Sequence, residues 1–201
     1  MKKSRITIVF MVILVTLIFG MGTSLCSAAG CFVIGGGNLA NGNSFGGNVM
    51  GMKDGRVRGE WQHTNGAYAF HGYAEFLYSY HDGGSGPEVP RAYPNRAIFG
   101  GMGTLQGQPG YLWIVAVADY KEGKESEDAG LSDAYGICIY RDVDGDGIAT
   151  AADEIVYELY ECVSGGNVQL IPPTDGHPYV PCVLTAEMLR VTSSLPLCTG
   201  S

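Results

Sequence analysis

Residues 68–80 read Tyr68-Ala69-Phe70-His71-Gly72-Tyr73-Ala74-Glu75-Phe76-Leu77-Tyr78-Ser79-Tyr80. Side chains alternate with a period of two, which predicts a β-strand with one face toward a core and one wetter face. We expect the mainly aromatic face to pack in the core, although such a stripe can also serve as a platform for stacking sugars. That face carries Tyr68, Phe70, Gly72, Ala74, Phe76, Tyr78 and Tyr80.

Similar runs continue on both sides of this strand. Glycine or asparagine separates most of them, and Asp54-Gly55 and Asn65-Gly66 predict type I′ hairpins. The sequence therefore predicts an all-β fold, an antiparallel β-sandwich of the jelly-roll or immunoglobulin-like type. The strands are expected at Cys31–Ile34, Gly47–Met52, Arg56–His63, Ala97–Leu105, Tyr111–Asp119, Tyr135–Arg141, Glu154–Cys162 and Asn167–Ile171. Turns are expected at Gly35-Gly36-Gly37, Asn41-Gly42, Gly83-Gly84, Gly107–Gly110 and Gly165-Gly166.

The composition agrees with many strands joined by tight turns. Glycine accounts for 31 of the 201 residues, and tyrosine for 12. Glycine serves turns that need a positive φ, while tyrosine suits a half-buried pleated surface.

The first residues have the layout of a secretory signal peptide. Lys2, Lys3 and Arg5 precede an apolar stretch from Ile6 to Phe19, and small residues follow it. We expect cleavage after residue 29 and export to the extracellular space or the cell surface. The apolar stretch is shorter than the roughly 20 residues of a spanning helix, and no later segment is apolar enough to span a bilayer.

Two cleavage sites are compatible with the sequence. An ordinary signal peptidase would accept Ser27-Ala28-Ala29 and leave Gly30 as the first residue. Alternatively, Ala28-Ala29-Gly30-Cys31 is similar to a lipobox, which would anchor a lipoprotein through acylated Cys31. Removal of Cys26 leaves an odd number of cysteines, namely Cys31, Cys138, Cys162, Cys182 and Cys198. Export permits disulfides, but cysteine spacing does not give their connectivity.

We therefore divide the chain into three segments: a signal peptide at 1–29, a β-sandwich domain at 30–171 and a Pro-rich extension at 172–201. Cys182 and Cys198 bracket the extension, and we expect a disulfide to pin it. Within the extension, Val183–Val191 fits either a strand or a short helix. The segments His81–Tyr93 and Lys121–Asp133 are expected to be surface loops.

Charge narrows the range of partners. Loss of the three basic residues in the signal peptide would take the net charge from −8 to −11. A surface this acidic excludes nucleic acid as a partner and disfavours anionic membranes, but it suits a protein that collects cations.

The strongest chemical motif is the twelve-residue stretch from Asp142 to Asp153. It places aspartates at positions 1, 3, 5 and 12 and glycine at position 6, a spacing that wraps oxygen atoms around one Ca²⁺ ion. Position 7 supplies a backbone carbonyl and position 9 acts through a water. The predicted calcium ligands are Asp142, Asp144, Asp146, Ile148, Thr150 and Asp153. Because both flanks read as strands, we expect the ion to clamp a β-hairpin.

The order of several motifs resembles the post-COAP domain family of secreted proteins. The resemblance covers residues 31–171 and implies a β-sandwich and export, without a known activity. It rests on Phe32-Val33-Ile34-Gly35-Gly36-Gly37, Ser44-Phe45-Gly46, Arg58-Gly59-Glu60-Trp61-Gln62-His63, Phe70-His71-Gly72, Ala97-Ile98-Phe99-Gly100, Gly103-Thr104-Leu105-Gln106-Gly107, Tyr111–Asp119 and Gly165-Gly166-Asn167-Val168. The calcium loop, the cysteines and the Pro-rich tail depart from the family pattern.

These features favour a non-enzymatic binding or adhesion module whose ligand is a surface glycan or a protein. A structural component of an envelope or extracellular matrix is the alternative, and a hydrolase is a weaker one. No nucleophile–base motif is present. The residues that could form an acid–base pair or metal site are His63, His71, His81, Glu60, Glu75 and Asp119.

Overall fold

The computed structural model describes residues 24–26, 31–80, 95–120, 131–171, 180–182 and 184–198. Several predicted features lie wholly or mostly outside these residues. They are the signal peptide apart from Ser24–Cys26, the loop His81–Tyr93 with His81, most of Lys121–Asp133, and the Pro-rich stretch that follows Ile171.

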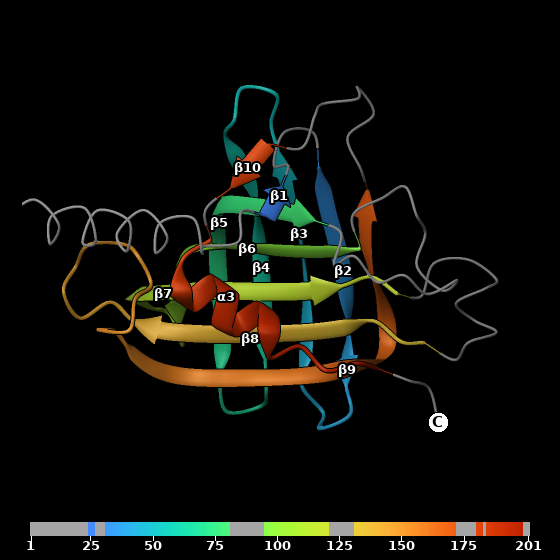
Figure 1. The fold of residues 1–201 in the computed structure, drawn as a ribbon. Coiled ribbons are helices and arrows are strands. Elements are labelled where there is room, and N and C mark those ends of the chain that lie inside the picture. The colour runs from blue at the N-terminus through green and yellow to red at the C-terminus, as the bar shows by residue number, and fades with distance from the viewer. Residues whose placement is uncertain are drawn as a thin grey trace, which may run out of the picture.

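Eight strands, β2 to β9, form a closed antiparallel barrel in which each strand pairs with the next and β9 pairs with β2 (Figure 1). All the predicted strands are present, although their ends move and two of them merge. The strands are β2 (Phe32–Leu39), β3 (Ser44–Gly51), β4 (Val57–Thr64), β5 (Ala69–Tyr80), β6 (Arg96–Leu105), β7 (Gln108–Ala118), β8 (Ala134–Arg141) and β9 (Glu154–Ile171).

The prediction of a β-sandwich is therefore wrong. In Figure 1, β6, β7 and β8 cross steeply in front of β2, β3 and β4, so the barrel is flattened into two layers. The layers are nevertheless continuous at both sides, through β5 on one side and through the β9–β2 pairing on the other. Alternation along a strand is the same in a sandwich and in a barrel, and only the pairing of the first strand with the last distinguishes them.

Strand β9 closes the barrel because it changes partners along its length. Its first half, up to Cys162, pairs with β8, and its second half, from Val163, pairs with β2. The predicted turn at Gly165-Gly166 is consequently part of a strand. Past Cys162, β9 no longer pairs with β8, and two of its backbone N–H groups donate to carboxylates instead. Val168 N–H donates to Asp133 at 2.8 Å, and Leu170 N–H donates to Asp119 at 2.8 Å.

A β-bulge at Glu75 divides the stripe that was predicted to form one face of β5. The register with β6 shifts between Ala74 and Phe76. Before the bulge Phe70, Gly72 and Ala74 point into the barrel, and after it Leu77 and Ser79 do. The aromatic residues of the stripe that follow the bulge, Phe76, Tyr78 and Tyr80, therefore turn to the outside, where they pack in a second apolar cluster, and Tyr68, which precedes β5, is exposed. Bulges of this kind let a strand bend from one layer to the other.

Large aromatic side chains fill the barrel. Trp61, Phe99, Trp113 and Tyr135 are fully buried, and Trp61 contacts both Phe99 and Tyr135 through ring contacts. The Gly35-Gly36-Gly37 stretch, predicted as a turn, lies inside β2. A Cβ on Gly35 would lie 3.3 Å from the Trp61 ring, so glycine leaves room for the indole there.

The predicted turns at Asn41-Gly42, Asp54-Gly55 and Asn65-Gly66 are present, whereas the turn predicted at Gly107–Gly110 lies at Gln106-Gly107 because β7 already begins at Gln108. At Asn65-Gly66 and at Asp54-Gly55 only the glycine has a positive φ, so neither turn is type I′. The β6–β7 hairpin is the one with two consecutive positive φ angles, 52° at Gln106 and 76° at Gly107, as type I′ requires.

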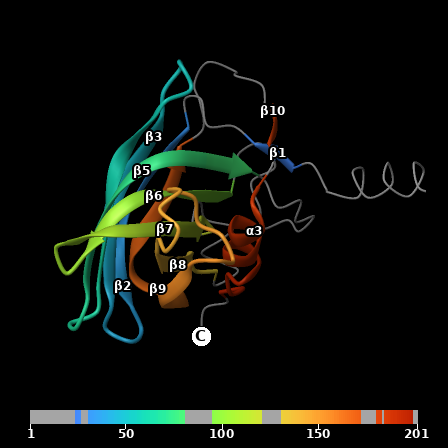
Figure 2. The same ribbon diagram turned by 90° about the vertical axis from the view of Figure 1, so that its left-hand side faces the viewer.

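The C-terminal segment packs on the outside of the barrel. Helix α3 (Ala186–Ser193) lies against β7 and β8, on the side away from β2 and β3 (Figure 2). A disulfide joins Cys162 of β9 to Cys198. A disulfide thus pins the tail, as expected, with Cys162 as the partner of Cys198. A separate two-stranded sheet pairs β1 (Ser24–Cys26) with β10 (Val180–Cys182).

Candidate metal centre

The predicted calcium loop connects β8 to β9. An exposed ion pair between Arg141 and Glu154, 2.9 Å long, closes its base, and Asp142 N–H donates to the Gly110 carbonyl at 3.2 Å. The flanking elements are strands, as the sequence predicts, so the loop is the tip of a β-hairpin.

Three of the predicted ligands converge. One carboxylate oxygen from each of Asp142, Asp144 and Asp146 lies within 4.8 Å of the others. Among the described residues, none of the three forms an ion pair with a basic side chain. Three carboxylates are therefore held close together, and no basic side chain of the described residues offsets their repulsion.

The backbone of the loop holds the aspartates in place. Gly145 and Gly147 adopt φ angles of 74° and 75°, the left-handed region in which glycine is favoured. Asp142 accepts hydrogen bonds from the N–H groups of both glycines, at 2.8 and 3.3 Å. Asp146 in turn accepts from the N–H of Ile148 at 2.7 Å. Every carboxylate oxygen keeps a lone pair that could bind a cation.

Asp153, the predicted twelfth-position ligand, lies apart from the other three. It is buried, and its two oxygens accept from Val143 N–H at 3.0 Å and from Thr150 N–H at 2.9 Å. Burial alone would raise the pKa of Asp153, but these backbone hydrogen bonds and the Thr150 hydroxyl outweigh burial and lower the pKa. Asp153 thereby ties the two ends of the loop together.

Ile148 and Thr150 differ in what they contact. The Ile148 side chain is exposed, which is compatible with a role through the backbone alone. Thr150 uses its hydroxyl within the loop, donating to Asp153 at 3.2 Å and accepting from Ala152 N–H at 3.2 Å. Between them Ala149 packs against the apolar cluster under α3, so the loop is seated on the barrel wall.

The donor set fits a hard divalent cation. All the candidate ligands are oxygens, which Ca²⁺ and Mg²⁺ prefer to nitrogen or sulfur, and a flexible loop with many oxygens favours Ca²⁺. The three converging carboxylates would supply the charge, and the backbone hydrogen bonds already hold them in position.

The residues considered for catalysis do not assemble into one site. His63 is buried inside the barrel, where its Nε2 lies 2.9 Å from the Tyr157 hydroxyl, and burial lowers its pKa to about 4. His71 and Glu60 do meet, at 3.0 Å, on the outer surface. Glu75 is exposed at the bulge, and Asp119 serves the backbone of β9. The described residues thus contain one histidine–carboxylate pair among these candidates.

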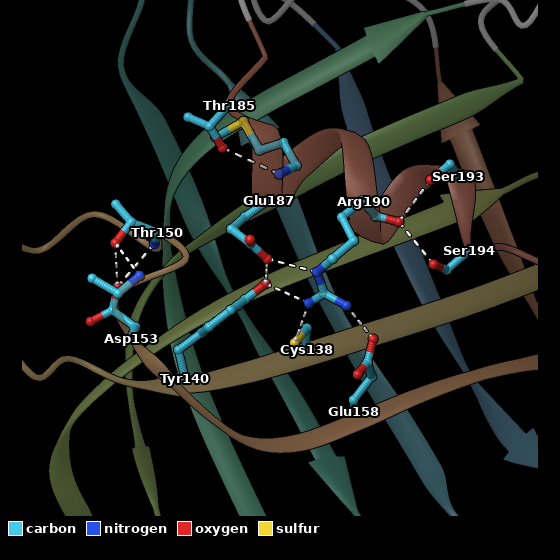
Figure 3. A network of polar contacts seen from close by, with 12 residues as sticks. Cys138, Tyr140, Thr150, Asp153, Glu158, Thr185, Glu187, Arg190, Ser193 and Ser194 are labelled. Atoms are coloured by element: carbon cyan, nitrogen blue, oxygen red, sulfur yellow. Dashed lines mark hydrogen bonds and ion pairs between the residues drawn. The ribbon is translucent and has the colours of Figure 1, made fainter.

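A second polar cluster was not predicted from the sequence. Under α3, Arg190 donates to Glu187 at 2.7 Å and to the Tyr140 hydroxyl at 2.9 Å, and it also contacts Glu158 and the Cys138 sulfur (Figure 3). Burial raises the pKa of the Cys138 thiol. In the sequence, only the spacing Glu187-x-x-Arg190 points to this cluster, because residues three apart lie on the same face of a helix and can form an ion pair. Because the sequence left Val183–Val191 open as either a strand or a helix, this spacing did not predict the ion pair.

Comparison with known proteins gives no relative. Neither a scan against protein-family models nor searches of curated proteins and of solved structures found a match to this chain. Among the described residues, no helix is long and apolar enough to cross a membrane.

Proposed function

We propose that this chain is an exported binding or adhesion module, non-enzymatic, built on a calcium-stabilised β-barrel. The observation that supports it most is the convergence of Asp142, Asp144 and Asp146 within 4.8 Å. Bound Ca²⁺ would neutralise the repulsion between these carboxylates and hold the β8–β9 hairpin closed. The signal-peptide pattern and the resemblance of residues 31–171 to the post-COAP family support export.

The filled barrel directs the ligand to the outer surface. Trp61, Trp113 and Tyr135 are fully buried in the interior and occupy the space that a ligand-carrying barrel would leave open. A glycan or protein ligand would therefore contact the outer faces of the strands or the loops that join them.

The cysteines favour a binding module over a covalently linked structural component. Cys31 and Cys138 are free but buried, and Cys162 is bonded to Cys198, so none of these four offers an exposed thiol for a link to another chain. The burial of Cys31 also favours the cleavage that leaves Gly30 first, because an acylated Cys31 would have to leave the barrel.

The calcium site is tested by thermal unfolding of the purified protein in calcium and in excess chelator. At a hundredfold excess over its dissociation constant, Ca²⁺ should add about 2.7 kcal/mol to the free energy of unfolding. An Asp144→Asn, Asp146→Asn double variant should lose this response and, in chelator, match or exceed the stability of the wild type, since repulsion is removed.

A charge-matched control separates the site from a general effect of acidity. Asp54→Asn with Glu161→Gln removes two carboxylates elsewhere and should keep the full calcium response. If calcium leaves the wild-type midpoint unchanged, or if both double variants respond alike, the loop is not a calcium site and the proposed stabilisation fails.

A further inference from the structure

The outer wall of the barrel carries a polar groove. It has a volume of about 310 Å³ and lies over β3 and β4. Its lining includes Ser44, Gly46, Asn48, Glu60, Gln62 and Thr64. Of these, Asn48, Glu60, Gln62 and Thr64 are exposed.

The groove is hollow at a point where the fold itself does not require glycine. Gly46 lines the groove, and Gly36 of β2, outside the lining, lies beside it in the β2–β3 register; the two are here called the glycine floor. A Cβ on Gly46 would meet nothing closer than 3.5 Å, and one on Gly36 nothing closer than 3.7 Å, both ordinary contacts. Neither residue has a positive φ. Glycine weakens a strand interior and marks a bulge, a tight bend at a barrel corner, or the close approach of a ligand or another backbone. The β2–β3 register runs without a shift through Gly36 and Gly46, which argues against a bulge there.

Neighbouring glycines show the contrast. A Cβ on Gly47 would lie 2.2 Å from the Glu60 carbonyl oxygen, and one on Gly59 would lie 2.1 Å from that of Asn48. Glycine at these two positions is needed for the strands to approach. At Gly36 and Gly46, which face outward, no such close contact requires glycine.

The walls of the groove are polar and mostly uncharged. Ser44 and Thr64 face each other across β3 and β4, and their hydroxyls hydrogen-bond at 2.7 Å. On the other side of the glycine floor, Asn48 is beside Glu60, and Gln62 is directly opposite Gly46. Amides and hydroxyls both donate and accept hydrogen bonds, whereas the carboxylate only accepts.

An exposed aromatic ring stands at the end of the same row. Tyr73 pairs with Glu60 across β4 and β5, and it is 62% exposed. The His71 ring packs edge-on against Tyr73, with ring centroids 4.9 Å apart, and His71 in turn contacts Glu60 at 3.0 Å. Tyr73 is thus a positioned aromatic surface beside a row of hydrogen-bonding groups.

We infer that this groove binds a neutral polysaccharide, with the sugar ring over Gly36 and Gly46 and the next unit against Tyr73. Sugars present hydroxyls that pair with amides and carboxylates, and their apolar ring faces pack on aromatic side chains. The chain's net charge of −8 and the Glu60 carboxylate in the wall disfavour acidic polymers. The inference rests on the proposed function as a binding module and assigns it a ligand class and a surface.

Affinity electrophoresis tests this inference with the purified protein in gels containing hydroxyethyl cellulose, laminarin, xylan or mannan, and in gels containing alginate or heparin. The wild type should be retarded by at least one neutral polymer and by neither acidic one. Gly46→Val, which fills the floor, and Gln62→Ala should each weaken the retardation about tenfold while the melting temperature stays at or above that of the wild type. Tyr73→Ala should also weaken it, unlike its matched control Tyr68→Ala.

Three results would overturn the inference: no retardation by any of the neutral polymers, retardation by the acidic polymers alone, or wild-type retardation of Gly46→Val. A second control, Gln108→Val, places valine at an exposed strand position away from the groove and should bind as the wild type does. The calcium response is measured separately. Loss of polysaccharide binding with an intact calcium response rejects the groove alone, and the reverse result rejects the calcium site alone.

Discussion

Two parts of the barrel wall differ on their outer faces. The outer face of β6, β7 and β8, here the covered wall, is apolar and lies under α3, where Ile98, Leu112, Ile114 and Tyr140 are fully or almost fully buried. The outer face of β2, β3 and β4, here the open wall, carries glycine, amides and hydroxyls, many of them exposed. Both walls enclose the same interior cluster.

This difference separates stability from recognition. Strands β7 and β8 are buried on both faces over most of their length, which adds a second apolar layer to that part of the barrel. The open wall buries only its inner face, so its outer residues are free to meet a ligand. Substitutions that loosen the covered wall should therefore cost stability, and substitutions on the open wall should cost little.

The largest expected effect is loss of the disulfide that holds the tail on the covered wall. The bond joins residues 36 positions apart. Loop-closure entropy for a span of that length corresponds to about 4 kcal/mol. Urea unfolding of a Cys162→Ala, Cys198→Ala variant should show this loss, and reductant should lower the wild type to the same midpoint. A wild type indifferent to reductant would show that the tail holds by packing alone.

Removal of Arg190 should rank second. Arg190→Ala leaves the largely buried Glu187 carboxylate with only the Tyr140 hydroxyl, whose hydrogen bond is 2.8 Å long. A buried charge that loses its partner costs about 3–5 kcal/mol. Because Arg190 and Glu158 are each about a third exposed, we expect about 2 kcal/mol in urea unfolding.

Arg141→Ala is the matched control for this variant. The Arg141–Glu154 pair is exposed on both sides, so its loss should cost less than about 1 kcal/mol. Equal losses in the two arginine variants would mean that the network under α3 adds nothing beyond a surface ion pair.

The sequence predicts the strands better than their closure. Alternation located each strand within a few residues, and Asp54-Gly55 and Asn65-Gly66 marked real turns. The near-continuous apolar sequences of β7 and β8 also indicate strands that are covered on both faces, since such strands lose their alternation of apolar and polar residues. The closure of the barrel could not be predicted from the sequence. It depends on β9 changing its partner strand at Val163 and on Asp133 and Asp119, which accept hydrogen bonds from its backbone.

The candidate metal site was readable because its geometry is local. Asp142, Asp144 and Asp146 lie within five consecutive positions, and Gly145 and Gly147 set the turn. The groove was not readable in the same way. Its lining combines residues of β3 and β4 that become neighbours only through the strand register, as Gln62 and Gly46 do, and Gly36 of β2 and Tyr73 of β5 lie next to it by the same register.

His63, on the inner face of the open wall, should make the free energy of unfolding depend on pH. Burial lowers the pKa of His63 to about 4, whereas the unfolded value is about 6.5. Above pH 6.5 both states hold neutral histidine and nothing is lost. As the pH falls toward 4, only the unfolded chain binds the proton, so stability declines, by about 2 kcal/mol at pH 5.

Comparison of wild type with His63→Gln isolates this contribution. Carboxylates titrate in both proteins, so the difference between their unfolding free energies at pH 7.5 and at pH 5 reports on His63. The variant should be less stable at pH 7.5, where it loses contacts with the Tyr135 and Tyr157 hydroxyls, and the gap should narrow at pH 5. A gap that is constant with pH would mean that the pKa of His63 is the same in the folded barrel and in the unfolded chain.

The smallest expected effect is on the floor of the groove. Gly36→Ala and Gly46→Ala should leave the free energy of unfolding unchanged or raise it by about 0.5 kcal/mol, because alanine restricts the unfolded chain and fits the folded one. Gly47→Ala is the control in the same strand: its Cβ would lie 2.2 Å from the Glu60 carbonyl oxygen, and overpacking of this kind costs about 1–3 kcal/mol. If Gly46→Ala loses as much stability as Gly47→Ala, the glycine floor has a structural reason. The open wall would then resemble the covered wall, with outer residues chosen for packing, and the groove would no longer call for a ligand.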